Sequence, residues 1–142
     1  MADYPDLLAG ETVLPQDELM HRQVTPGQHQ DGEPLLEAFA PTREHDRKLS
    51  VACNSKVSAE EAFVAHTDRG LASVGSWPIW HGTVQEVELR AVDDSALDGV
   101  PDYHGYVDFR RGTRAERKMA ADTLREAAVV EGPTFLPRGT VH

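Results

Sequence analysis

Cysteine is nearly absent from the chain, with Cys53 the only one among 142 residues. An internal disulfide is therefore excluded, and we expect a reducing, cytoplasmic setting. Long apolar runs are also absent: the longest are a few residues, against the ~20 that a membrane-spanning helix needs. The acidic opening MADYPDLLAGE contains no apolar segment of the kind found in secretory signals. We therefore predict no membrane association.

Basic residues are scarce, since 14 Lys and Arg stand against 24 Asp and Glu, for a net charge of −10. This balance opposes non-specific phosphate binding, so we do not expect a nucleic-acid partner. It suits a protein partner with a basic surface. One basic cluster departs from the pattern, and it is interpreted as a solvated loop and helix start, with a basic patch as the alternative. Its members are Arg110, Arg111, Arg114, Arg117 and Lys118.

Alternating apolar and polar residues predict strands over 17–24, 49–53, 84–92 and 103–109. The segment 71–80 is expected to be extended, and Pro78 places it at an edge or a bulge because proline donates no ladder hydrogen bond. Residues 35–40 are ambiguous between a strand and a helical turn. Residues 134–136 are compatible with a short final strand.

Two helices are predicted from their capping signals. Ser58 with Glu61 and Thr113 with Glu116 each match the Ser/Thr-x-x-Glu capping box, in which the two residues satisfy each other's backbone amides. Gly70 is a natural end for the first helix. The second carries an apolar stripe at helical spacing, typical of core packing, and Gly132 and Pro133 end it.

The composition is that of a globular protein, with 39% hydrophobic and 27% charged residues. Strands outnumber helices, and the helices are separated by strands. We therefore predict a single α+β domain with one mixed or antiparallel sheet and two main helices over residues 17–142. Residues 1–16 are expected to form a flexible acidic arm.

The segment 41–66 holds the densest collection of reactive side chains. It contains the pair His45-Asp46, the strand with Cys53, and His66 near the end of the first predicted helix. The seven histidines of the chain are scattered, without the close ligand pairs of a zinc site. We therefore assign no metal ligands, although a metal-dependent enzyme using His45, Asp46 and His66 stays open as an alternative.

Nucleophilic and phosphate-binding motifs are also missing. No G-x-S-x-G elbow, Walker loop or G-x-G-x-x-G is present. Cys53 could act as a nucleophile with His45 or His66 as its base, but a lone cysteine in an apolar strand is usually a small buried hydrophobic residue. The sequence identifies no cofactor.

The pair His21-Arg22, followed by PLLEAFAPTREHDRKLSVACNSKVSAEEAF, resembles the RES group of ADP-ribosyltransferase-like domains. This resemblance implies that Arg22 contacts NAD and that Glu60 or Glu61 orients the reacting ribose. On this basis Arg22 and Ser50 are candidate cofactor-binding residues.

A broader resemblance covers most of the chain, from Met20 to Leu136. The stretches HRQV, AFAPT, LSV and GLASVG are similar to those of a family of small uncharacterised bacterial proteins. This resemblance implies one domain and a bacterial origin, and it supplies no mechanism.

Two classes of function follow. The first is a small acidic accessory or protein-binding domain, such as a regulatory or immunity-like partner of a basic protein. The alternative is an enzyme acting on NAD or nucleotides, with Arg22 binding phosphate and a histidine or glutamate transferring protons. The candidate catalytic residues are Arg22, His45 and His66, and their convergence with Ser50 on one cavity would favour the enzyme.

Overall fold

A computed structural model of the chain describes residues 4–138, which form a single α+β domain around a six-stranded antiparallel sheet. The strand order across the sheet is β1-β7-β8-β5-β2-β6. The predicted fold class is therefore confirmed, with the antiparallel form of the sheet. The strands are β1 (Thr12–Val13), β2 (Leu19–Val24), β5 (Lys48–Cys53), β6 (Gly75–Trp80), β7 (Arg90–Asp93) and β8 (His104–Asp108).

Three α-helices and several short turns complete the domain. The helices are α1 (Ala59–Asp68), α2 (His81–Glu86) and α3 (Arg114–Glu131), and β3 (His29–Gln30) with β4 (Glu33–Pro34) form a separate small hairpin. Three 3-10 turns span Pro26–Gln28 (η1), Leu36–Ala38 (η2) and Arg43–His45 (η3). Both predicted capping boxes are present, at the N-termini of α1 and α3.

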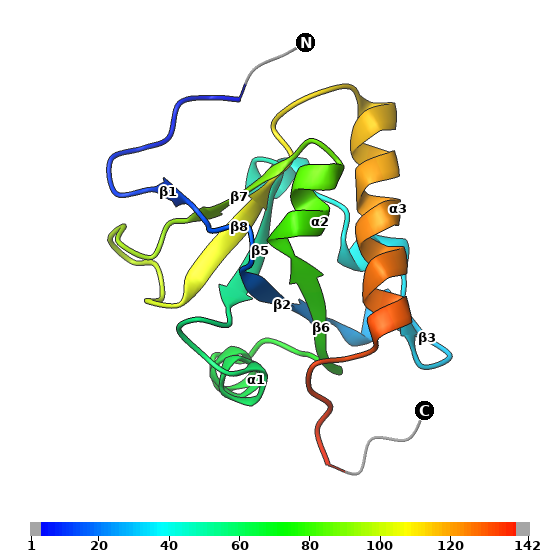
Figure 1. Cartoon of the computed structure of the whole chain (residues 1–142). Coiled ribbons are helices and arrows are strands. Elements are labelled where there is room, and N and C mark those ends of the chain that lie inside the picture. The colour runs from blue at the N-terminus through cyan, green and yellow to red at the C-terminus, as the bar shows by residue number, and fades with distance from the viewer. Residues whose placement is uncertain (1–3, 139–142) are drawn as a thin grey trace.

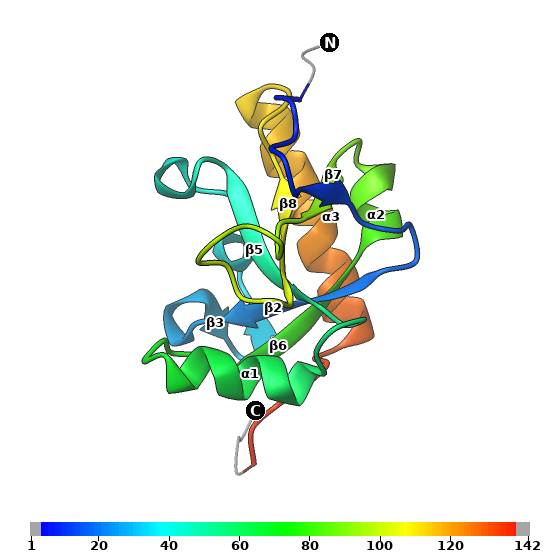
Figure 2. The ribbon, with the colours of Figure 1, turned by 90° about the vertical axis from the view of Figure 1, so that its left-hand side faces the viewer.

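The two long helices lie at different parts of the sheet. Helix α3 runs along one side with α2 beside it (Figure 1), whereas α1 lies next to β2 and β6 (Figure 2). The core lies between α3 and the sheet, where Met20, Val107, Phe109 and Leu124 are almost fully buried. Consecutive residues are buried in β5, β6 and β8, so both faces of the central sheet are largely covered.

The strands predicted over 17–24, 49–53 and 103–109 are confirmed as β2, β5 and β8. Pro78 lies in β6, which is an edge strand of the sheet, as predicted. The strand predicted over 84–92 is wrong in its first half, because α2 extends to Glu86. Val84 and Val87 are three residues apart, which is a helical spacing, and both pack on the core.

The segment predicted as an acidic arm contributes to the sheet. Strand β1 pairs with β7, and Leu14, directly after it, is 6% exposed. The Glu11 carboxylate accepts a hydrogen bond from the Tyr106 hydroxyl at 2.8 Å. Near the other end of the described chain, Phe135 forms an isolated bridge with Ser76 of β6, where a short final strand was considered. Within residues 4–138, no helix is long and apolar enough to cross a membrane.

Candidate functional site

One cavity of about 350 Å³ opens between α1 and the strands β2 and β5. Arg22, His45, Ser50 and His66, the four residues whose convergence the sequence analysis singled out, all line it. They are joined there by cationic and aromatic side chains, including Arg69, Tyr103 and His104. We refer to this space as the histidine cavity.

Arg22 occupies the point where β2 and β5 separate. The two strands pair only at Met20–Cys53 and His21–Ala52, after which β2 continues beside β6 and β5 beside β8. In the resulting gap, Nε of Arg22 donates to the Ala38 carbonyl at 2.7 Å, and Nη1 donates to the Ser50 carbonyl at 2.9 Å. The guanidinium therefore bridges the opening in the sheet.

The charge of Arg22 has no counterion among residues 4–138, because no carboxylate of that part of the chain forms an ion pair with it. Burial lowers its pKa to about 10, so it is still a cation near neutral pH. Two of its five N–H donors are engaged with carbonyls, and three are left to bind other acceptors. A partly buried cation in this state favours an anionic ligand.

His66 projects from the last turn of α1 and is half-buried. Its Nε2 donates to the Ala72 carbonyl at 3.3 Å. Burial lowers the pKa of His66 and the positive charges of Arg69 and Arg22 lower it further, although the hydrogen bond with Ala72 acts in the opposite direction. A neutral His66 with its proton on Nε2 has a lone pair on Nδ1, and such a nitrogen can accept a proton.

His45 and Ser50 lie at the outer side of the cavity. His45 ends the η3 turn, and its Nδ1 is 2.9 Å from the Thr42 hydroxyl oxygen, which fixes the ring. Ser50 is exposed on β5, where its carbonyl accepts the hydrogen bond from Arg22. Both residues also line a smaller hollow of about 110 Å³ that continues past Arg22 toward Lys48.

His104 is held by a carboxylate. Its Nδ1 is 2.7 Å from Oδ1 of Asp94, which is 8% exposed. Because a carboxylate only accepts, Nδ1 carries the proton and Nε2 keeps a lone pair. This is the arrangement by which an aspartate orients a histidine for general-base catalysis.

Several other candidates have structural duties instead. His21 lines the cavity wall but is 2% exposed, with Nδ1 bound to the Thr134 hydroxyl at 3.1 Å and Nε2 to the Asn54 side chain at 2.9 Å. Burial raises the pKa of Cys53 to about 12, which leaves the thiol protonated and unreactive. Glu61 is engaged with Ser58 in the capping box. Neither Glu60 nor Glu61 lines the histidine cavity.

The metal-dependent alternative finds no support in the described part of the chain. Among residues 4–138, no group of three or more histidine, cysteine, aspartate or glutamate side chains is arranged to hold a metal ion. The Asp46 side chain is 75% exposed and faces Arg110 at 3.8 Å. His45 and His66 share their cavity with Arg22 and Arg69, and no carboxylate is among the described residues that line it.

His104, Asp94 and Arg69 were missed by reasoning from sequence. The proximity of His104 and Asp94 could have been inferred, because the predicted strands over 84–92 and 103–109 are joined by a turn-rich link and so suggest a hairpin. In the structure Asp93 of β7 pairs with Gly105 of β8, which brings the adjoining Asp94 and His104 together. Arg69 follows α1 directly, and nothing in its spacing indicated a role.

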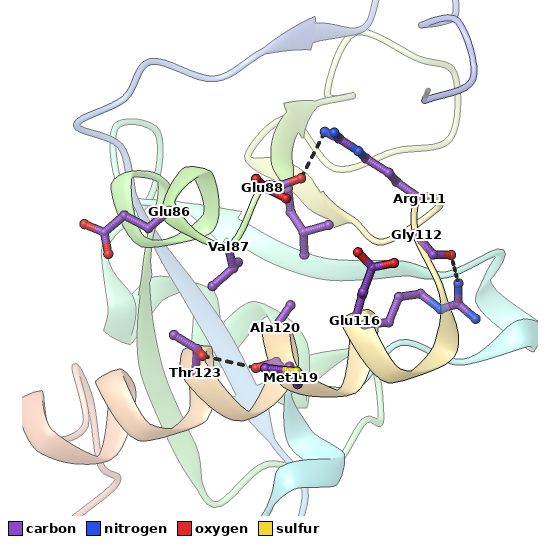
Figure 3. A pocket seen from close by; sticks show the side chains of 11 residues that line it. Glu86, Val87, Glu88, Arg111, Gly112, Glu116, Met119, Ala120 and Thr123 are labelled. Atoms are coloured by element: carbon purple, nitrogen blue, oxygen red, sulfur yellow. Dashed lines mark hydrogen bonds between the residues drawn. The ribbon is translucent and has the colours of Figure 1, made fainter. Parts of the chain in front are cut away.

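A second cavity, of about 250 Å³, has a different character (Figure 3). It lies between the end of α2 and the first half of α3. Val87, Met119 and Ala120 supply apolar surface, and Met119 is 71% exposed. Its charged lining residues are the glutamates Glu86, Glu88 and Glu116 and the arginines Arg111 and Arg117. We refer to this space as the α2–α3 groove.

Comparison of the chain with protein-family models, with curated proteins and with solved structures finds no match.

Proposed function

We propose that the protein is an enzyme that uses histidine acid–base catalysis on a small phosphate-bearing molecule of the NAD or nucleotide class. One observation carries the proposal: the histidine cavity brings an uncompensated arginine together with the imidazoles of His45, His66 and His104. In each of these three rings one nitrogen has a hydrogen-bond partner, and the other has none among residues 4–138. Oriented imidazoles beside a cation are what general acid–base catalysis on an anion requires.

An anionic substrate is favoured by the local charge. The protein as a whole carries a net charge of −10, yet Arg22 and Arg69 both line this cavity. An arginine that is partly desolvated and lacks a carboxylate partner binds phosphate oxygens strongly. The cavity volume of about 350 Å³ lies in the lower part of the range of small-molecule sites.

The proton-transfer roles follow from the hydrogen bonds. In this proposal His104, oriented by Asp94, takes a proton from a water as the water oxygen bonds to a phosphorus of the substrate. His66 or His45 gives a proton to the leaving oxygen as its P–O bond breaks, once the bound anion has raised the affinity of the ring for protons. The resemblance to ADP-ribosyltransferase-like domains supports NAD as one substrate. The Glu61 carboxylate is engaged in the capping box of α1. We therefore assign proton transfer to the histidines.

The experiment is a turnover assay with the purified protein. NAD and a set of nucleoside mono-, di- and triphosphates are each incubated with it, and the products are separated by chromatography. We expect turnover of at least one compound, lost in His104→Gln and in Arg69→Gln but kept in Arg138→Gln, a charge-matched control outside the cavity. Far-UV circular dichroism checks folding. If no compound is turned over and none raises the melting temperature at millimolar concentration, the proposal is wrong.

The α2–α3 groove favours a second candidate function, namely the binding of a basic protein partner by a small cytoplasmic accessory domain. An exposed methionine beside apolar surface is common at adaptable protein-binding sites. Three glutamates against two arginines line the groove, and this acidic excess supports a basic segment as the partner.

The second candidate is tested by titration with a synthetic amphipathic peptide of lysine and leucine. The methyl groups of Val87 and Ala120, which line the groove and remain in every variant, report binding by NMR. We expect a saturable shift that is lost in the Met119→Lys variant. An unsaturable response, or one unchanged in that variant, excludes this function for the groove.

A further inference from the structure

A third cavity, the largest of the three at about 660 Å³, gathers basic side chains. It lies between the N-terminal half of α3 and the chain from η2 to η3. We refer to it as the arginine cleft. Glu37 is the carboxylate among the residues that line it, and the cations are Arg43, Arg47, Arg114, Arg117 and Lys118.

None of these five cations forms an ion pair with a carboxylate of residues 4–138, although the chain holds 24 acidic residues. Some basic residues elsewhere are paired: Arg90 and Arg110 both bind Asp108, and Lys56 binds Asp93 at 2.7 Å. Arg22 and Arg69 of the histidine cavity form no ion pair within the described chain either, but the arginine cleft gathers five such cations in one place.

The fold holds the cations together against their mutual repulsion. Arg117 and Lys118 follow Arg114 by three and four residues on α3, so the three share one side of the helix. Arg117 is fixed by a hydrogen bond from its Nη1 to the carbonyl of Gly112 at 2.7 Å, a residue labelled in Figure 3. Partial burial lowers the pKa of Arg117, and the positive charges of Arg47 and Arg114 lower it further.

Arg47 reaches the cleft from a strained turn. Asp46 and Arg47 are consecutive non-glycine residues in the left-handed region, with φ of 53° and 54°. The turn is fixed by hydrogen bonds from the Arg47 amide to the Thr42 carbonyl at 2.9 Å and from the Phe109 amide to the Arg47 carbonyl at 3.0 Å. Strain of this kind persists where surrounding contacts enforce it, and it is frequent at ligand sites.

We propose that the arginine cleft binds a compact anion carrying two or more phosphate groups, at a site separate from the histidine cavity. Arginine forms paired hydrogen bonds with phosphate, and four arginines with a lysine match several phosphates at once. The volume is in the range of small-molecule sites. A compact ligand is favoured over a long nucleic acid because the net charge of −10 repels a chain that extends beyond the cleft.

The η3 turn separates the two sites. Arg43 and Arg47 line the arginine cleft, and His45 lines the histidine cavity. The two sets of lining residues share no member. Binding at one site can therefore be tested independently of binding at the other.

The test uses inorganic tripolyphosphate as the probe and isothermal titration calorimetry at about 50 mM and about 150 mM salt, where screening of exposed charges differs. We expect a principal site whose affinity falls as salt rises and which the cleft double variant loses, and any weaker binding in the histidine cavity is identified by its loss in Arg69→Gln. The variant with Arg114→Gln and Lys118→Gln should bind about 10-fold more weakly or worse, since it removes two of the five cations that line the cleft. The exposed positions of both residues favour normal folding, and the melting temperature checks it.

The variant Arg69→Gln, in the histidine cavity, should bind tripolyphosphate at the principal site as the wild type does. Loss of binding in Arg69→Gln with retention in the double variant would assign the anion to the other cavity and overturn the proposal. Absence of binding to the wild type at the lower salt concentration would also overturn it. So would tighter binding of a single-stranded oligonucleotide than of tripolyphosphate, because that result indicates an extended nucleic-acid surface.

Discussion

His104 and Asp94 face each other across the β7–β8 hairpin, with Nδ1 of the imidazole 2.7 Å from Oδ1 of the carboxylate. Asp94 is almost buried, whereas the His104 side chain is 23% exposed and lines the histidine cavity. Asp94 is therefore shielded from solvent, whereas the ring of His104 is accessible from the cavity. This difference in exposure distinguishes the pair from a surface ion pair and supports a role for His104 in proton transfer.

The variant Asp94→Asn tests this role. The amide keeps the size of the side chain but can donate, and so it permits the wrong tautomer of His104. We expect turnover of the substrate found in the activity assay to fall by about 100-fold or more. His104→Gln should cause a similar loss, and the double variant should lose little more, because residues acting as one unit are not additive. If the turnover losses of the two single variants multiplied in the double variant, the two residues would act independently, and a shared role would be contradicted.

Anion binding in the histidine cavity should be coupled to proton uptake by His66. Its pKa is lowered by burial and by the charges of Arg69 and Arg22, so the ring is neutral near pH 7. A bound anion offsets those charges and raises the pKa, which means that affinity should increase as pH falls from neutral through the pKa of His66 in the complex.

The measurement is calorimetry with ADP in buffers of different ionisation enthalpy, on the arginine-cleft double variant so that only the histidine cavity responds. The buffer dependence gives the number of protons taken up. His66→Gln should bind without that uptake. Equal affinity at about pH 5.5 and about pH 7.5 would exclude the coupling.

The sheet and the two long helices were predictable because their signals are local. Strand alternation and the capping boxes at Ser58 and Thr113 depend on residues a few positions apart. Helix α2 was mistaken for a strand because its core contact is long-range. The buried His81 accepts from the Ala91 amide through Nε2 and binds the Pro15 carbonyl through Nδ1, and no local pattern reveals those partners.

The candidate site was predictable only as a set of residue types. Arg22, His45, Ser50 and His66 were selected for their chemistry, and the separation of β2 from β5 brings them together. That separation depends on a guanidinium binding two distant carbonyls, which sequence alternation cannot show. His104 and Asp94 could have been found from the predicted hairpin, since its closing residues must be neighbours.

Arg22 should contribute to stability as well as to ligand binding. Replacing it with methionine removes the hydrogen bonds to the Ala38 and Ser50 carbonyls. Hydrogen bonds to a charged group contribute about 1.5–3 kcal/mol, so a loss of about 2 kcal/mol in the free energy of unfolding is expected. Arg22→Lys should recover only part of this, because one ammonium lacks the planar fork that reaches both acceptors. Urea unfolding measures the difference, and full recovery by lysine would contradict the bridging role.

Asp108 should control the stability of the domain in acid. Its side chain is fully buried and accepts hydrogen bonds from Nε of Arg90 at 3.0 Å and from Nε and Nη2 of Arg110, both at 2.9 Å. Burial by itself would raise the pKa of Asp108, but the hydrogen bonds from Arg110 and Arg90 hold it below its usual value.

A carboxyl group with a lowered pKa stabilises the folded state above its unfolded-state pKa of about 3.9, and this contribution is lost as pH falls through the folded-state value. Asp108→Ala should cost about 3–5 kcal/mol at neutral pH, since it leaves two arginines without their shared partner. Asp108→Asn is the matched control, because it keeps the shape but cannot titrate. Urea unfolding from about pH 7 to about pH 2 should show a smaller acid-dependent loss in Asp108→Asn than in the wild type. The same acid-dependent loss in both proteins would assign the acid sensitivity to other carboxylates.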